Sequence, residues 1–160
     1  MLVVLLHVIT AFALVAGIVG RSVAFHHARL ATDVRVTVAM LRLVEQFERR
    51  LVMPASEWII GFGLVAAWLR HWPMLGFVQG ANTNWLLVSI VLYLGLIPPV
   101  VIWIIPRRKL RIRLAEEAEK SGAITPELAA ALRDPIVSAY RIAEAVVIGV
   151  VLMLMVTKPF

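Results

Sequence analysis

Four long apolar runs constrain the fold of this chain more than any other feature. They cover roughly residues 2–24, 52–70, 84–105 and 136–157. Each is close to the roughly 20 residues that a helix needs to cross a bilayer. The chain is 61% hydrophobic, whereas soluble domains contain about 45–50% apolar residues. The sequence therefore predicts an all-α integral membrane four-helix bundle, with residues 1–160 forming a single membrane domain in the lipid bilayer.

The first run has few features of a cleavable signal peptide. No basic residue precedes it, its apolar stretch is too long, and no A-x-A-like site in a polar context follows it. We therefore expect a retained helix. The chain also contains no cysteine, which excludes a disulfide, a thiolate metal site and a cysteine nucleophile.

Basic residues are unevenly distributed between the apolar runs. The counts are six from Arg21 to Arg50, one at Arg70, eight from Arg107 to Arg141, and one at Lys158. Since cytoplasmic loops are enriched in Lys and Arg, we expect the segments 25–51 and 106–135 to be cytoplasmic. Both termini would then lie outside the cytoplasmic (inner) membrane of a bacterium. The net charge of +6 reflects this orientation signal, and no nucleic-acid partner is expected.

The segment between the first two runs carries a helical stripe of apolar residues. Its members recur every three or four positions: Leu30, Val34, Val38, Leu41, Val44, Phe47 and Leu51. The pattern predicts an amphipathic helix, either on the cytoplasmic membrane surface or packed against the bundle. We favour a plain connector over a lipid-binding device.

Prolines mark the expected irregularities of these helices. Pro54 is compatible with the first turn of the second span, and Asp134-Pro135 has the cap-and-proline order that starts a helix. Pro98-Pro99 lies deep within the third run and removes two backbone donors. We expect a kink or break there.

Polar and small side chains share one stripe of the first helix. Steps of three and four residues connect His7, Thr10, Leu14, Gly17 and Arg21. Lipid offers no partner to a histidine or an arginine, so this stripe should face other helices.

Two interpretations of His7 remain open at this stage. We favour a hydrogen-bonded packing residue that pairs with Thr10 or Ser89. The alternative is an axial ligand of haem b, since His with Met or a second His is a known axial pair. Either Met153 or His71 would supply the second ligand.

A second polar cluster is expected near the cytoplasmic ends of the spans, formed by Arg21, Glu57, Arg141 and Glu144. Charges inside a membrane protein survive by pairing with one another. We favour a clamp that fixes helix register, and the alternative is a proton or ion path. The sequence contains no nucleophile elbow, phosphate loop or His-Glu-x-x-His motif, so no catalytic residue is assigned.

Several segments together resemble a family of bacterial integral membrane proteins, domain-of-unknown-function family 2269. They are LLHVITAFALVAGIVGR, LVMPASEWIIGFGLVAAW, NWLLVSIVLYL and LMVTKPF. The resemblance covers essentially the whole chain. It implies a multi-pass membrane protein and no particular activity.

The first helix also resembles, more distantly, two four-helix membrane groups. These are the copper-resistance D membrane domain and the haem-binding membrane protoporphyrinogen oxidases. Both have an early histidine, then a small residue and a basic residue, as His7, Gly17 and Arg21 do here. The oxidases also use a bundle lysine, which this chain lacks in its second and third runs. The resemblance therefore leaves haem contact by His7 open and does not extend to the oxidase activity.

These observations lead to one main functional expectation. We expect a non-enzymatic subunit or accessory protein that associates with other membrane subunits or with itself. A haem-binding redox or haem-handling protein is the alternative, and ion or small-solute transport is a weaker one.

Overall fold

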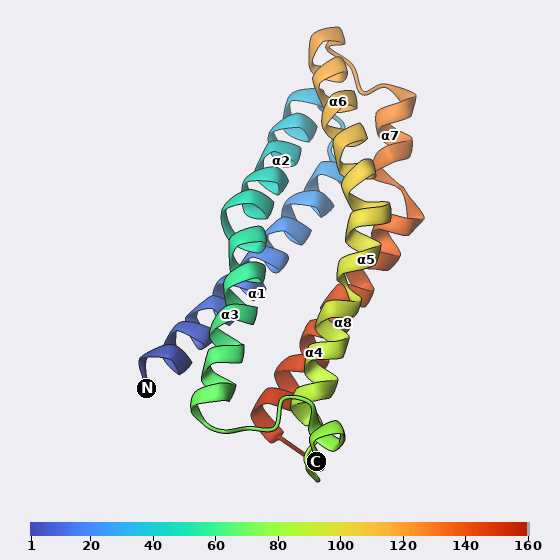
Figure 1. Ribbon diagram of the computed structural model, residues 1–160. Coiled ribbons are helices and arrows are strands. Elements are labelled where there is room, and N and C mark those ends of the chain that lie inside the picture. Colours follow the sequence, from blue (N-terminus) through green and yellow to red (C-terminus); the bar gives the residue numbers. More distant parts are fainter. Residues whose placement is uncertain (160) are drawn as a thin grey trace.

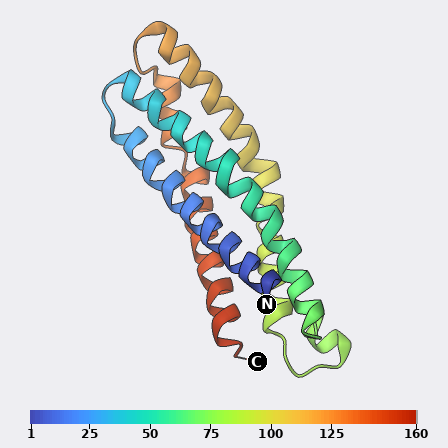
Figure 2. The same cartoon turned by 90° about the vertical axis from the view of Figure 1, so that its left-hand side faces the viewer.

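The all-α prediction is confirmed. The computed structural model describes residues 1–159, and in this part of the chain four helical stretches are long and apolar enough to cross a membrane. They are Leu2–Leu30, Val34–Leu69, Trp85–Ser121 and Pro126–Thr157. Successive stretches run in opposite directions, and Met1 lies at the same end of the molecule as the end of the last helix (Figure 1, Figure 2).

The second stretch is continuous, although the sequence suggested a connector followed by a separate span. Helix α2 (Val34–Phe47) passes through a π-helical turn, η1 (Glu48–Val52), directly into α3 (Met53–Leu69). At 36 residues it is about 54 Å long. Its partner α1 (Leu2–Leu30) likewise continues six residues beyond the end expected for the first span.

The apolar stripe of α2 packs inside the chain. Val38, Leu41 and Val44 are buried in a cluster with residues of α1, of α6 (Ile105–Ser121) and of α7 (Pro126–Leu132). Of the two placements that the sequence left open for this helix, packing against the bundle is the one observed.

Prolines account for both π-helical turns. Pro54 lies in the first turn of α3, as expected, and Pro106 lies in the first turn of α6. A π turn stands just before each: η1, and η3 (Val100–Ile104). A proline has no N–H and its ring clashes with the carbonyl four residues earlier. The i→i−5 bonds from Met53 to Glu48 and from Ile105 to Val100 widen the helix ahead of each proline.

The break expected at Pro98-Pro99 is present as an interruption of regular α-helix. Helix α4 (Trp85–Gly95) is followed by the single turn α5 (Ile97–Pro99) and then by η3. The chain nevertheless continues in the same direction into α6 (Figure 1).

The last helix begins as the sequence predicts. The Asp134 carboxylate accepts a hydrogen bond from the Ile136 N–H at 2.8 Å, and α8 spans Pro135–Thr157. It packs against α4. The loop between α3 and α4 contains a short 3-10 turn, η2 (Gly76–Gln79).

Glycines let α1 approach the α2–η1 segment closely. A Cβ added to Gly17 would lie 2.9 Å from both Leu51 Cβ and Val52 Cγ2, and one added to Gly20 would lie 2.5 Å from the Phe47 ring. Small residues allow such close contact between helices in lipid. This contact brings Arg21 of α1 close to Glu48 of η1.

Candidate functional site

A buried ion network joins three helical elements around Arg21. The Arg21 guanidinium contacts Glu48 of η1 at 2.5 Å, and it also contacts Glu144 of α8. All three side chains are largely buried, with exposed fractions of 9%, 16% and 9%. Because an isolated buried charge is costly, each of these groups depends on its partners.

Arg108 extends the network to α6. Its guanidinium lies 2.9 Å from Glu45 and 3.6 Å from Glu48. Glu48 therefore bridges Arg21 and Arg108, so that one carboxylate connects α1 to α6 through the π turn. An arrangement of this kind holds helices in register and leaves no carboxylate of the network free of a cation.

Two further arginines stack on one aromatic ring beside the network. The Arg141 guanidinium lies 3.7 Å and the Arg111 guanidinium 4.8 Å from the centre of the Phe25 ring. Cation–π contacts stabilise such groups where water is scarce. Arg21 Nε and Arg111 Nη1 are buried and have no hydrogen-bond partner within residues 1–159.

The structure brings together three of the four residues of the predicted charge cluster. Arg21 and Glu144 form an ion pair, and Arg141 stacks on Phe25 one helical turn away from Arg21 along α1. Glu57 lies apart: it is exposed and makes no ion pair with the described residues. Glu48, which was not part of the predicted cluster, lies beside Arg21 instead.

Sequence reasoning missed Glu48, although a signal for it was present. Glu48 continues the three- and four-residue spacing of Leu41 and Val44, so it lies on the stripe that is buried. A carboxylate on a buried stripe requires a cation. The spacing does not reveal, however, that the cations would come from α1 and α6.

His7 contacts α3 through a glycine. Its Nδ1 lies 3.0 Å from the Ile59 carbonyl oxygen, and a Cβ added to Gly63 would lie 3.0 Å from His7 Cε1. His7 thus makes a hydrogen bond to another helix, and its partner is neither of the two hydroxyls considered. Thr10 donates to Leu6 and Ser89 donates to Trp85, each to a backbone carbonyl on its own helix.

The other residues named as haem ligands face different surroundings. Met153 is 57% exposed and shares the outer face of α8 with Ile142 and Val146, whereas Ile148 and Leu154 are buried. His71 is exposed beyond the end of α3. Among the described residues, no group of three or more His, Asp or Glu side chains could hold a metal ion.

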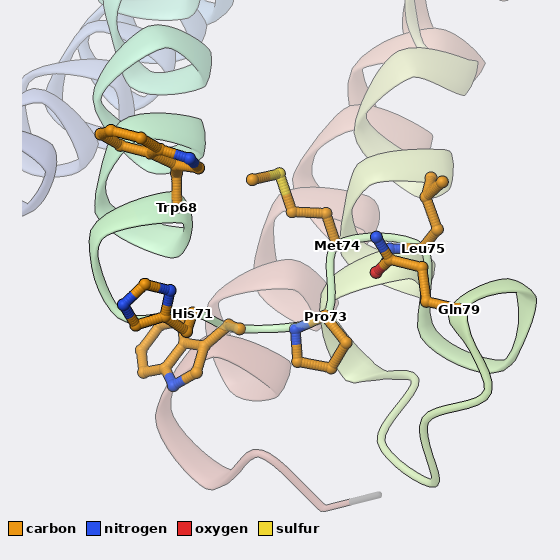
Figure 3. A pocket seen from close by; sticks show the side chains of 7 residues that line it. Trp68, His71, Pro73, Met74, Leu75 and Gln79 are labelled. Carbon is orange, nitrogen blue, oxygen red and sulfur yellow. The ribbon is translucent and has the colours of Figure 1, made fainter.

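His71 lines a pocket at the end of α3 together with residues of the following loop. Its volume is about 580 Å³, and the lining residues are Trp68, His71, Trp72, Pro73, Met74, Leu75 and Gln79. Figure 3 shows Trp68 and His71 on the side of α3, and Met74, Leu75 and Gln79 on the side of the loop. The Trp72 ring packs edge-on against Trp85 at 5.3 Å between centroids. Tryptophans gathered at one end of the helices fit an interfacial aromatic belt.

The comparisons with known proteins agree with this architecture and assign no reaction to it. Neither the curated proteins nor the solved structures contain a match to the chain. Residues 1–159 match the family described as predicted integral membrane protein (DUF2269). With the match covering the described chain and four candidate spans in the structure, the protein belongs to the DUF2269 family of integral membrane proteins.

Proposed function

We propose that this protein is a non-enzymatic subunit or accessory protein of a membrane assembly, formed with other subunits or with further copies of itself. It lies in the cytoplasmic membrane of a bacterium, with residues 25–51 and 106–135 on the cytoplasmic side and both termini outside. The Lys and Arg distribution supports this orientation. The charge network around Arg21 then acts as a clamp near the cytoplasmic ends of the spans.

The exposed position of Glu57, unpaired within residues 1–159, is the observation that supports the proposal. Glu57 lies on the exposed face of α3, where Gly61 and Leu64 are its neighbours at helical spacing and the exposed Trp58 follows it in the chain. An ionisable group on an apolar face is costly in lipid unless it is paired. No cation within residues 1–159 pairs with Glu57, so a cation or hydrogen-bond donor from another helix is the partner that this face requires.

Gly61 makes the same face suitable for a helix contact. A Cβ added there would meet no atom within 4 Å, so the backbone is open to the outside. Small residues permit the close approach on which helix association in lipid depends. A partner helix seated over Gly61 would also cover Glu57, one turn earlier in α3.

Crosslinking tests this interface directly, because the chain has no cysteine of its own. We expect Gly61→Cys to give an oxidative crosslink in native membranes, to itself or to a partner that carries a cysteine. Gly149→Cys is the matched control, since Gly149 is also open but lies on the outer face of α8. We further expect Glu57→Leu to reduce the assembled fraction in mild detergent. A stable monomer with no co-purifying partner, and no Gly61 crosslink, would contradict the proposal.

Haem binding is a second candidate, favoured by the contact that His7 makes. When Nδ1–H donates to the Ile59 carbonyl at 3.0 Å, the lone pair of Nε2 remains available. Metal-bound histidines commonly donate their other ring nitrogen to a backbone carbonyl in this way. His7 is therefore the residue through which haem b would bind.

An absorption spectrum tests the haem candidate. We expect protein from haem-replete cells to show a Soret band that His7→Ala removes. His26→Ala is the control, because His26 is exposed on the same helix. Either the absence of a Soret band or a band unchanged in His7→Ala would exclude His7 as the ligand.

A further inference from the structure

The outer surface of the α2–η1 segment carries a pocket that shares only Glu45 with the ion network. Its volume is about 370 Å³, and Glu45, Gln46, Arg49 and Arg50 line it. Spacings of one, four and five residues place these four side chains on one side of the helix. Gln46, Arg49 and Arg50 are exposed, whereas the neighbouring Val44 is buried in the core.

The charge of this pocket is positive. Arg49 and Arg50 make no ion pair with any residue from 1 to 159, and both guanidiniums are therefore available. Glu45, whose carboxylate is also in the lining, is held by Arg108 at 2.9 Å, which offsets its charge. The free donors are thus two guanidiniums and the Gln46 amide.

The pocket also lies at a particular depth. The apolar run of the second span begins at about residue 52, three residues beyond Arg49, which is about 4.5 Å along the helix axis. If the orientation proposed above holds, the two arginines lie at the cytoplasmic membrane surface, where lipid phosphates are found. Clusters of basic residues beside a span attract anionic lipids.

We propose that this pocket binds the phosphate group of an anionic ligand, with an anionic phospholipid headgroup as the occupant in the membrane. Arg49 and Arg50 each present the planar fork of donors that matches phosphate oxygens. Gln46 adds a neutral donor on the same side of the helix. Because residues 51–55 are apolar, acyl chains of the bound lipid enter the membrane beside the first turn of α3.

Native mass spectrometry of the delipidated full chain in detergent tests the proposal. Three probes are added separately: phosphatidylglycerol, phosphatidylcholine and inorganic phosphate. We expect phosphatidylglycerol to bind at least about tenfold more tightly than phosphatidylcholine. Binding of inorganic phosphate that competes with phosphatidylglycerol would indicate free phosphate as a second source of the same ligand chemistry. Equal binding of the two lipids would overturn the proposal.

A pair of double variants separates this pocket from general charge attraction. We expect Arg49→Gln/Arg50→Gln to weaken phosphatidylglycerol binding about tenfold or more. Arg29→Gln/Arg35→Gln removes the same charge from exposed positions elsewhere and should leave binding within about twofold of the original. Equal losses in both double variants would overturn the proposal. Thermal unfolding of both variants verifies that they remain folded.

The inference about the occupant rests on the proposed orientation, but the two can fail separately. Labelling of Arg50→Cys with a membrane-impermeant thiol reagent from each side of the membrane reports the orientation alone. Lipid binding in detergent does not depend on sidedness. If Arg50→Cys is labelled only from outside, the proposed orientation is wrong, whereas phosphatidylglycerol selectivity would still establish the pocket.

Discussion

The two ends of the bundle are stabilised in different ways. At the basic end, α1, α2, α6 and α7 enclose the most extensive buried cluster of the described chain, which includes Phe25, Val38 and Leu128. At the other end, α1 exposes Leu5 and Phe12 to the surroundings. A segment in water must bury its own apolar side chains, whereas a segment in lipid gains nothing from doing so.

Polar contacts follow the same division. Ion pairs join different helices at the basic end, as in the pairs of Arg21 with Glu48 and of Arg107 with Asp134. At the opposite end no ion pair joins two helices among the described residues, and the contacts there include the cation–π contact of Lys158 with Trp72 and the hydrogen bond between His7 and the Ile59 carbonyl. Helix register is therefore specified mainly at the basic end, and substitutions there should have the larger effects.

Removal of the central cation should have the largest effect. Arg21→Gln leaves the buried Glu48 and Glu144 without their shared partner. Breaking a buried pair in this way costs about 3–5 kcal/mol of the free energy of unfolding. Thermal or denaturant unfolding in detergent measures the loss.

Arg42→Gln is the control for Arg21. It removes an ion pair with Glu119 whose side chains are 64% and 46% exposed, and exposed pairs contribute about 0–1 kcal/mol. Equal losses from the two substitutions would show that the network around Arg21 does not stabilise the fold.

Local features of the fold were predictable from the sequence, whereas the continuity of its longest helices was not. The apolar runs identified the four candidate spans, and the Asp134-Pro135 start of α8 was confirmed, because hydropathy and capping are local properties. The continuity of α2 with α3 was missed. Pro54 indicates a helix start in isolation, but the π turn before it accommodates the missing donor.

The candidate site was predictable only in part. Arg21 and Glu144 were recognised as charges that need partners, and they pair. Glu48 and Arg108 were not, since their roles depend on which helices pack together. His7 was expected to pair with a side-chain hydroxyl, but it contacts the Ile59 carbonyl. Every residue carries a backbone carbonyl, so the residue types do not reveal which carbonyl a histidine of another helix will contact.

Close helix packing at the basic end gives the next largest expected effect. Gly17→Ala places a Cβ 2.9 Å from Leu51 and Val52, and overpacking of this kind costs about 1–3 kcal/mol. Gly149→Ala is the matched control, because its Cβ would meet no atom within 4 Å. Alanine is also the better helix former by up to about 1 kcal/mol. The free energy of unfolding of the monomer in detergent should fall for Gly17→Ala and rise for Gly149→Ala. A change of the same sign in both variants would contradict the assigned packing.

Loss of the aromatic platform should have a smaller effect. Phe25→Leu keeps an apolar side chain but removes the ring on which Arg111 and Arg141 stack. Cation–π contacts contribute about 0.5–2 kcal/mol each, so we expect the loss of both contacts to cost at least about 1 kcal/mol. Unfolding of Phe25→Tyr, which retains the ring, should show most of the stability restored. If Tyr is as unstable as Leu, packing volume rather than the ring face is the cause.

The smallest effect is expected at the opposite end of the molecule. The Lys158 ammonium lies 4.4 Å from the Trp72 ring and 5.7 Å from the Trp85 ring, and it is exposed. A cation–π contact at an exposed site contributes about 0.5–1 kcal/mol. Lys158→Gln should therefore lower the free energy of unfolding by no more than that, and Lys158→Arg should preserve it. A loss as large as that of Arg21→Gln would mean that both ends specify the register of the bundle equally, which the distribution of ion pairs and buried residues does not predict.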